Sequence, residues 1–154
     1  MITIINITDK WTIMQSARKI LRALPHWFGI PASIDEYVKT CPNYPFFCCY
    51  DHNRPIGFIS IKPHFEKSAE IYVMGVLEDY HRQGIGRRLV ICCEAYCRDH
   101  GIGYLQVKTL DASHPDPYYA KTRAFYLAMG FCEVECFPNL WDKNNPCVLM
   151  IKAL

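Results

Sequence analysis

The chain has 154 residues and a mass of 17.9 kDa, and hydrophobic residues make up 51% of it. This is enough apolar material for a substantial core, so we expect one domain over residues 1–154. A formal net charge of +2 gives no electrostatic basis for nucleic-acid binding. No apolar run approaches the roughly 20 residues of a membrane span, and the N-terminus lacks the pattern of a signal peptide. We therefore expect a soluble, cytoplasmic protein without a nucleic-acid or membrane partner.

The nine cysteines and six histidines form no recognisable framework. The number of cysteines is odd, no Cys-x-x-Cys is present, and several cysteines fall inside apolar periodic segments. We therefore expect buried, reduced cysteines rather than disulfides. The histidines are scattered and no pair has the spacing of zinc ligands, so we expect no metal site.

Residues 1–76 predict a strand, two helices and three further strands. The strands are expected at 2–7, 46–50, 56–61 and 69–76, with a hairpin connection over 51–55. Thr8 is placed to cap the first helix, and Pro25 ends it. The apolar face of this helix would hold Trp11, Met14, Ala17, Leu21 and Leu24. Ser33-Ile-Asp-Glu36 has the spacing of a capping box and predicts a second helix to about residue 40.

Residues 77–154 predict two helices and three strands. One helix is expected from a pair of glycines to about residue 99, and another over 119–129, ended by Gly130. The apolar face of the longer helix would hold Leu89, Cys92, Cys93 and Tyr96. Strands are expected at 104–110, 132–137 and 148–153. The whole order is therefore β-α-α-β-β-β-α-β-α-β-β.

The segment from Ala69 to Gly86 carries the strongest functional signal. An apolar alternating run ends, a short polar loop follows, and Gly84 and Gly86 open an amphipathic helix. The first turn of a helix has N–H groups without intrahelical partners and carries partial positive charge. The glycines remove Cβ atoms that would keep a bulky anion away, and nearby arginines add cationic charge. The loop therefore has the chemistry of a pyrophosphate-binding site.

Other kinds of glycine loop fit the residues less well. A P-loop needs Gly-x4-Gly-Lys-Ser/Thr, and no such run occurs. A dinucleotide-binding loop needs a third glycine where Leu89 stands, although Asp111 follows the next predicted strand, roughly where a ribose-binding acid would sit. A plain strand–helix junction that uses glycine for its backbone freedom also stays open.

Two motifs in this order resemble the GNAT superfamily of acyl-CoA-dependent N-acyltransferases. His81-Arg-Gln-Gly84-Ile-Gly86 is similar to the family's Gln/Arg-x-x-Gly-x-Gly/Ala loop. Downstream, Tyr126 stands four residues before Gly130-Phe131, as in the family's characteristic helix. The resemblance covers essentially the whole chain and implies an α/β fold with a mixed central sheet of about seven strands flanked by helices. His81 and Tyr119 depart from the family's usual Gln or Arg and Asn.

The resemblance implies acetyl-CoA as cosubstrate, with its pyrophosphate on the backbone of the glycine loop. The expected coenzyme-binding residues are Met74, Gly75, Val76, His81, Arg82, Gln83, Gly84, Ile85, Gly86, Arg87, Tyr119 and Thr122. Gly75 lies within a predicted strand, where glycine commonly marks a bulge. A bulge there would splay the strand from its neighbour and free a strand N–H, near Met74 or Gly75, to polarise the thioester. The alternative is a glycine packed under a large side chain.

The resemblance also implies two catalytic side chains. Tyr126 would be the general acid that protonates the leaving thiolate, although a core aromatic is the alternative. Glu70 would be the general base, as in protein-acetylating members of the family, although a solvated residue at a strand start is the alternative. Strand alternation predicts Glu70, Tyr72 and Met74 on one face of the sheet.

The acceptor is the least determined part of the interpretation. The family implies a pocket from the first two helices and the last hairpin, and the candidates are Trp27, Phe28, Tyr37, Tyr72 and Trp141. We expect direct transfer of the acetyl group to a primary amine of a small molecule in a ternary complex. A protein lysine or N-terminal acetyltransferase and a non-catalytic acyl-CoA sensor are the alternatives. By analogy with the family, a homodimer is also considered.

Overall fold

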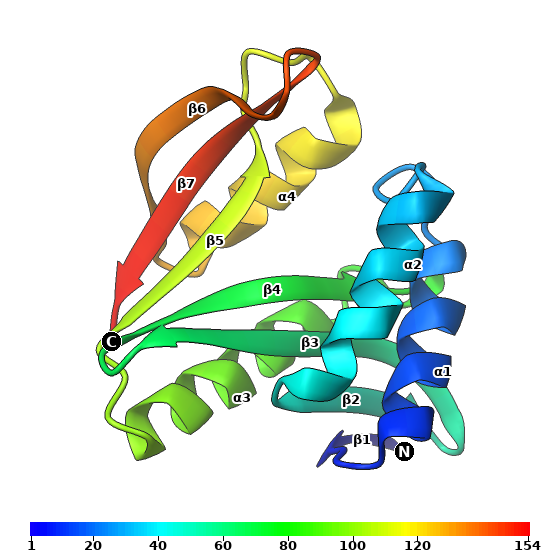
Figure 1. The fold of residues 1–154 in the computed structure, drawn as a ribbon. Helices are drawn as coiled ribbons and strands as arrows, with labels where there is room; N and C mark the ends of the chain where they lie inside the picture. The colour runs from blue at the N-terminus through cyan, green and yellow to red at the C-terminus, as the bar shows by residue number, and fades with distance from the viewer.

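A seven-stranded mixed sheet forms the centre of the computed structural model, which describes residues 1–154 (Figure 1). Its strand order is β1-β2-β3-β4-β5-β7-β6, and only the β4–β5 pair is parallel. The strands are β1 (Ile2–Asn6), β2 (Phe46–Asp51), β3 (Arg54–Phe65), β4 (Ser68–Val76), β5 (Tyr104–Leu110), β6 (Cys132–Asp142) and β7 (Asn145–Ala153). The helices are α1 (Lys10–Arg22), α2 (Pro31–Thr40), α3 (Ile85–Asp99) and α4 (Pro117–Ala128), with single 3₁₀ turns η1 (Cys41–Asn43) and η2 (Glu78–Tyr80). The predicted fold class and order of strands and helices are confirmed.

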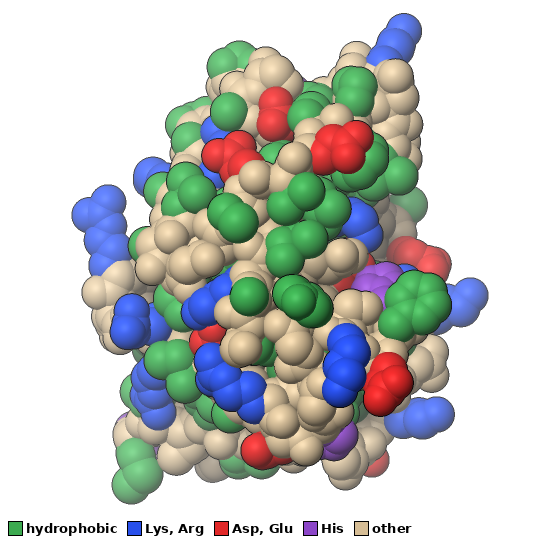
Figure 2. Space-filling view, turned by 90° about the vertical axis from the view of Figure 1, so that its left-hand side faces the viewer, with side chains coloured by type: hydrophobic (Ala, Val, Ile, Leu, Met, Phe, Trp, Pro, Cys, Tyr) green, Lys and Arg blue, Asp and Glu red, His purple; other side chains and the backbone are tan.

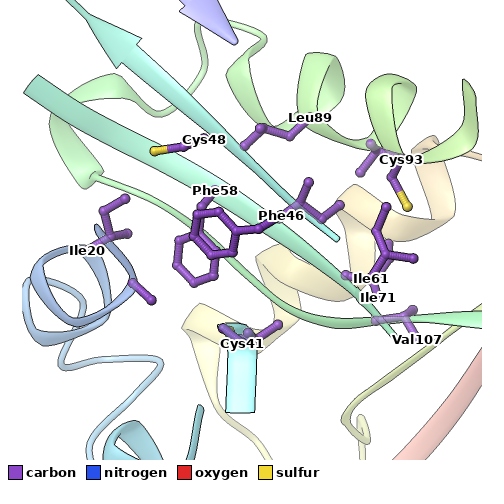
Figure 3. Packing of buried hydrophobic residues seen from close by; sticks show 14 of the residues in the cluster. Ile20, Cys41, Phe46, Cys48, Phe58, Ile61, Ile71, Leu89, Cys93 and Val107 are labelled. Carbon is purple, nitrogen blue, oxygen red and sulfur yellow. The ribbon is translucent and has the colours of Figure 1, made fainter. Parts of the chain in front are cut away.

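The core lies on both faces of β2, β3 and β4. On one face, the stacked rings of Phe46 and Phe58, with centroids 5.0 Å apart, pack beside Ile20 of α1 (Figure 3). On the other face, Leu89 and Cys93 of α3 cover the sheet (Figure 3). Complete burial of each large apolar side chain contributes roughly 1.5–3 kcal/mol. This two-sided packing fixes β4, which carries the functional segment.

The helix starts differ from the sequence expectation. Asp9, not Thr8, caps α1, because its carboxylate accepts the Thr12 N–H at 2.8 Å. Trp11 is 69% exposed and does not belong to the buried face, which Ile13, Ala17, Ile20, Leu21 and Leu24 form. Helix α2 begins at Pro31 without a side-chain cap, so the predicted capping box at Ser33 is wrong. Proline favours the first helical position because it lacks an N–H and has a helical φ.

Two of the hairpins, β2–β3 and β6–β7, are tighter than predicted. Asp51 pairs with Arg54, so only two residues turn between β2 and β3, and His52 has a left-handed φ of 56°. At the C-terminal hairpin, Asp142 pairs with Asn145, and the strands run into the segment predicted as a loop. Paired backbone groups extend these strands beyond the runs that side-chain patterns mark.

Charged side chains are dispersed on the side of the molecule that shows β6 and β7. Figure 2 shows single lysines and arginines separated by polar and apolar groups, with several acidic side chains toward the top. No continuous patch of one charge is visible on this face. No helix is long and apolar enough to cross a membrane.

Candidate active site

Strands β4 and β5 diverge and leave a wedge in the middle of the sheet (Figure 1). Only three residue pairs join them, and the last is Glu70 with Gln106. Beyond Glu70, β4 pairs with β3 alone. The wedge, defined here as the space between residues 71–76 of β4 and the second half of β5, therefore has unpaired main chain along one side.

The predicted bulge at Gly75 is wrong. Gly75 pairs in register with Phe58, and a Cβ on it would lie 3.0 Å from Leu24 Cδ1 and 3.4 Å from Ile20 Cγ2. Glycine is present there because α1 packs directly on the strand. The irregularity lies earlier, where Ser60 pairs with Val73 and Ile61 with Ile71, so that Tyr72 is the additional residue.

The irregularity at Tyr72 also changes which residues share a face. Lys62 lies opposite Glu70 and its ammonium is over the Tyr72 ring, so Glu70 and Tyr72 share the α2 side of the sheet. Gly75 faces α1, and alternation therefore turns Met74 to the α3 side. The prediction of one face for Glu70, Tyr72 and Met74 is wrong for Met74.

The main chain of Met74 nevertheless points into the wedge. Leu77 N–H donates to the Ile56 carbonyl at 2.9 Å, which fixes the phase of the antiparallel ladder between β3 and β4. Because hydrogen-bonding direction alternates along such a ladder, the N–H and C=O groups of Met74 and Val76 point away from β3. The Val76 carbonyl is 2.6 Å from His81 Nε2. The N–H of Met74 is thus a strand donor on the open side.

The glycine loop ends in an uncapped helix N-terminus. Gly84 is the N-cap of α3, with a left-handed φ of 77°, and no side chain caps the helix. The N–H groups of Ile85, Gly86 and Arg87 therefore lack side-chain partners. No atom lies within 4 Å of a Cβ built on Gly84, whereas one on Gly86 would lie 3.2 Å from the Phe125 ring. This open, positively polarised end fits a diphosphate.

Basic side chains surround this helix end, but His81 is held in place. Arg82, Arg87 and Arg88 are exposed, and Arg82 has a φ of 63°. The His81 ring bonds the Val76 carbonyl, so it braces the loop against the end of β4. Gln83 Nε2 similarly donates to the Asp79 carbonyl at 3.2 Å. The arginines, rather than His81 or Gln83, are the side chains free to meet an anion.

Tyr126 is buried in α4 against aromatic neighbours. It is 5% exposed, and its ring meets Phe125 and Phe131 edge-on at 5.4 and 5.6 Å between centroids. Burial, followed by the nearby Tyr119, raises the pKa of Tyr126 well above its ordinary value. The phenol is therefore protonated through neutral pH and can act only as a proton donor.

The loop after α1 closes over α4 through Trp27. The indole Nε1 donates to Thr122 Oγ1 at 3.2 Å, and the Tyr119 hydroxyl donates to the Trp27 carbonyl. The indole also meets His81 edge-on, with centroids 5.5 Å apart. Tyr119 and Thr122, predicted as coenzyme-binding residues, thus hold Trp27 between the glycine loop and α4. We call these contacts of Trp27 with Tyr119 and Thr122 the clasp. They join residues that are 92 and 95 positions apart in the chain, so no local sequence pattern reveals them.

Glu70 is enclosed by other side chains. The alternative interpretation, that it is a solvated residue at the start of a strand, is therefore wrong. It is 7% exposed, His64 Nε2 is 2.7 Å from Oε1, and Lys108 Nζ lies 3.2 and 3.3 Å from its two oxygens. Gln106 Nε2 is 3.5 Å from Oε1. These partners come from β3 and β5, so no pattern within β4 predicts them.

Three of the predicted acceptor residues form one aromatic wall. Phe28, Tyr37, Tyr72 and Tyr44 meet edge-on in that order, at 6.1, 5.3 and 5.2 Å between centroids. Burial, then Tyr72 and Glu70, raise the pKa of Tyr37 to about 12. Trp141 lies on the edge strand β6, is 48% exposed and makes no ring contact with the wall. The structure does not bring Trp141 to the other candidates.

Comparisons with known proteins agree with this geometry. The model of the acetyltransferase (GNAT) family matches residues 14–131. An uncharacterized N-acetyltransferase of Chlorobaculum tepidum is 32% identical over 120 residues, which are 71% of this chain and 70% of that protein. A putative GNAT acetyltransferase structure from Desulfovibrio desulfuricans has a TM-score of 0.85 at 17% identity over 99% of each chain. An aminoglycoside 6'-N-acetyltransferase complexed with coenzyme A has a TM-score of 0.78 at 20% identity, covering 98% of this chain and 96% of its own.

Proposed function

The chain belongs to the GNAT family of acetyltransferases, and we propose that it transfers the acetyl group of acetyl-CoA directly to the primary amine of a small molecule. As a family member it is an acyl-CoA-dependent N-acetyltransferase. The observation that carries the proposal is the wedge between β4 and β5, into which the Met74 N–H points, and the uncapped start of α3 also supports it. Amide formation from a thioester needs an anchor, an oxyanion donor and a proton donor, and for these we propose the start of α3, the Met74 N–H and Tyr126.

The anchor would be the start of α3. The N–H groups of Ile85, Gly86 and Arg87 would hold the pyrophosphate, and Arg82 and Arg87 would add charge-assisted hydrogen bonds. Bound there, acetyl-CoA supplies a thioester, an acyl group already activated for attack by an amine. Gly84 keeps the approach open because no atom occupies the space beside it.

The Met74 N–H would stabilise the oxyanion. It is a fixed strand donor on the side of β4 that faces the wedge. A preorganised donor of this kind is worth roughly 3 kcal/mol in other acyl-transfer sites. Because the donor is main chain, its position depends on the pairing of β4 with β3 and not on the Met74 side chain.

Tyr126 and Glu70 would move the protons. The protonated Tyr126 phenol would give its proton to the departing thiolate, and general acids of this kind contribute about 10²–10⁴-fold. On the acceptor side, Glu70 would take the proton of the amine directly or through water. It also contacts the His64 ring, whose Nε2 is 2.7 Å from Oε1.

The test is turnover by the purified protein with acetyl-CoA and a panel of primary amines. We expect thiol release that depends on the amine, with intersecting initial-rate lines that indicate a ternary complex. Parallel lines or a burst of acetyl-enzyme would contradict direct transfer. Binding of acetyl-CoA without turnover of any amine would instead support the non-catalytic sensor.

A further inference from the structure

The buried acid beside the wedge is already paired with a cation. Glu70 is only 7% exposed. Its two carboxylate oxygens already face the Lys108 ammonium and the His64 ring. An acceptor with several ammonium groups, such as an aminoglycoside, requires carboxylates that remain free to pair with it. Glu70 therefore offers no free carboxylate to such an acceptor.

Lys62 supplies a positive charge that no acid neutralises. It lies opposite Glu70 in the pairing of β3 with β4, and its ammonium is 5.9 Å from the centroid of the Tyr72 ring. No carboxylate oxygen lies within 4.0 Å of this ammonium. A cation that lies over an aromatic ring and has no acid partner is free to bind an anionic group.

The other elements that pack around Lys62 bring no acid within 4.0 Å of its ammonium. Strand β5 contributes Lys108 and the neutral Gln106, and β3 contributes His64. Helix α2 contributes Glu36, which is exposed and accepts the Thr40 hydroxyl at 3.4 Å. Lys108 is therefore paired with Glu70, whereas Lys62 has no acid within 4.0 Å, Glu36 included.

We propose that the acceptor is an amino acid, a primary amine that also carries a carboxylate, and that Lys62 binds the carboxylate; this rests on the proposed function. The half-buried rings of Tyr37, Tyr44 and Tyr72 would accept an apolar or aromatic side chain.

The test compares amino acids with the amines they yield on decarboxylation. We would measure kcat/KM for phenylalanine and phenethylamine, leucine and 3-methylbutylamine, and lysine and cadaverine, with spermidine as a polycation. In the pairs that react, the amino acid should be preferred by about tenfold or more, as expected when a charge-assisted hydrogen bond is gained.

Variants at Lys62 locate the carboxylate. Lys62→Met should reduce the preference to about twofold or less, and Lys62→Arg should retain most of it. Lys62 has no acid partner, so Lys62→Met leaves no buried charge unpaired. The matched control is Lys67→Met, in the same hairpin but with its ammonium near Gly101, and it should leave the preference unchanged.

The outcomes separate this inference from the proposed function. Better use of a decarboxylated amine or of spermidine by the unmodified protein overturns the amino-acid inference and leaves the acetyltransferase proposal intact. An unchanged preference for the amino acid over its decarboxylated amine in Lys62→Met also overturns the amino-acid inference and leaves the acetyltransferase proposal intact. If no amine accelerates thiol release, the proposed function and the amino-acid inference fail together.

Discussion

Replacing Tyr126 by phenylalanine tests the proton donor with little structural disturbance. None of the side-chain hydrogen bonds made by α4 involves the Tyr126 hydroxyl, so Tyr126→Phe removes no protein partner. The ring contacts with Phe125 and Phe131 remain, because they depend on the aromatic faces and edges. We therefore expect the free energy of unfolding to change by less than about 1 kcal/mol.

The catalytic effect of Tyr126→Phe should be much larger. Loss of a general acid predicts a fall in kcat of roughly 100-fold, which corresponds to about 2.7 kcal/mol of transition-state stabilisation. The dissociation constant of acetyl-CoA should change less than about twofold, because the hydroxyl is not among the groups expected to hold the diphosphate. Stopped-flow thiol release at saturating substrates measures kcat, and calorimetry measures binding.

The pH dependence gives an independent check on the same residue. Burial raises the pKa of Tyr126, so the donor form persists below that pKa and is lost only as the pH rises through it. The unmodified protein should thus show no loss of kcat from Tyr126 between about pH 7 and 9. The control is Tyr96→Phe, at a tyrosine of α3 stacked on His100, which should leave kcat unchanged. An unchanged kcat in Tyr126→Phe would refute the assignment.

Three further predictions concern the anchor, the core and the clasp. Gly84→Ala should cost roughly 1–2 kcal/mol of stability and weaken acetyl-CoA binding, because Gly84 has a φ of 77° although no atom crowds the new Cβ. The control in thermal unfolding is Gly103→Ala, at a glycine that is equally uncrowded but has no positive φ. Equal effects of the two substitutions would contradict the backbone argument. Lys152→Met should lower the free energy of unfolding in urea by about 3–5 kcal/mol, because it leaves the Glu94 carboxylate, which is 4% exposed, without its cation. Recovery of stability in the double variant with Glu94→Gln would confirm this reason. A loss of stability below about 1 kcal/mol in Lys152→Met would exclude it. Saturating acetyl-CoA should change the tryptophan fluorescence emission of the protein, and Trp27→Phe should abolish that change, because the Trp27 indole lies between His81 and Thr122. A change that persists in Trp27→Phe would show that another tryptophan responds to acetyl-CoA.

The fold was predictable because its elements follow from local hydrophobic periodicity. Burial of one face of α1 and alternation along β4 are visible in the residue order, and the structure has both. The helix starts were not fixed in the same way. Thr8 was the predicted cap, but the next residue, Asp9, is also of a type that caps helices, and the backbone geometry selects it. Pro31 outweighed the capping-box spacing at Ser33 for a similar reason.

The candidate site divides into a local and a non-local part. The glycine loop is local, since Gly84 and the uncapped first turn of α3 follow one another in the chain. The surroundings of Glu70 are not, because His64 and Lys108 reach it from neighbouring strands. The irregularity at Tyr72 is also non-local, because it depends on the register between β3 and β4. Periodicity within one segment cannot reveal contacts of this kind.

Calorimetric titration with acetyl-CoA and with acetyl-pantetheine, which carries the same thioester without the nucleotide diphosphate, tests the central claim most directly. If the uncapped N–H groups of Ile85, Gly86 and Arg87 hold the diphosphate, acetyl-CoA should bind saturably and at least about tenfold more tightly than acetyl-pantetheine. Equal affinities for the two thioesters, or no heat with acetyl-CoA, would contradict the account.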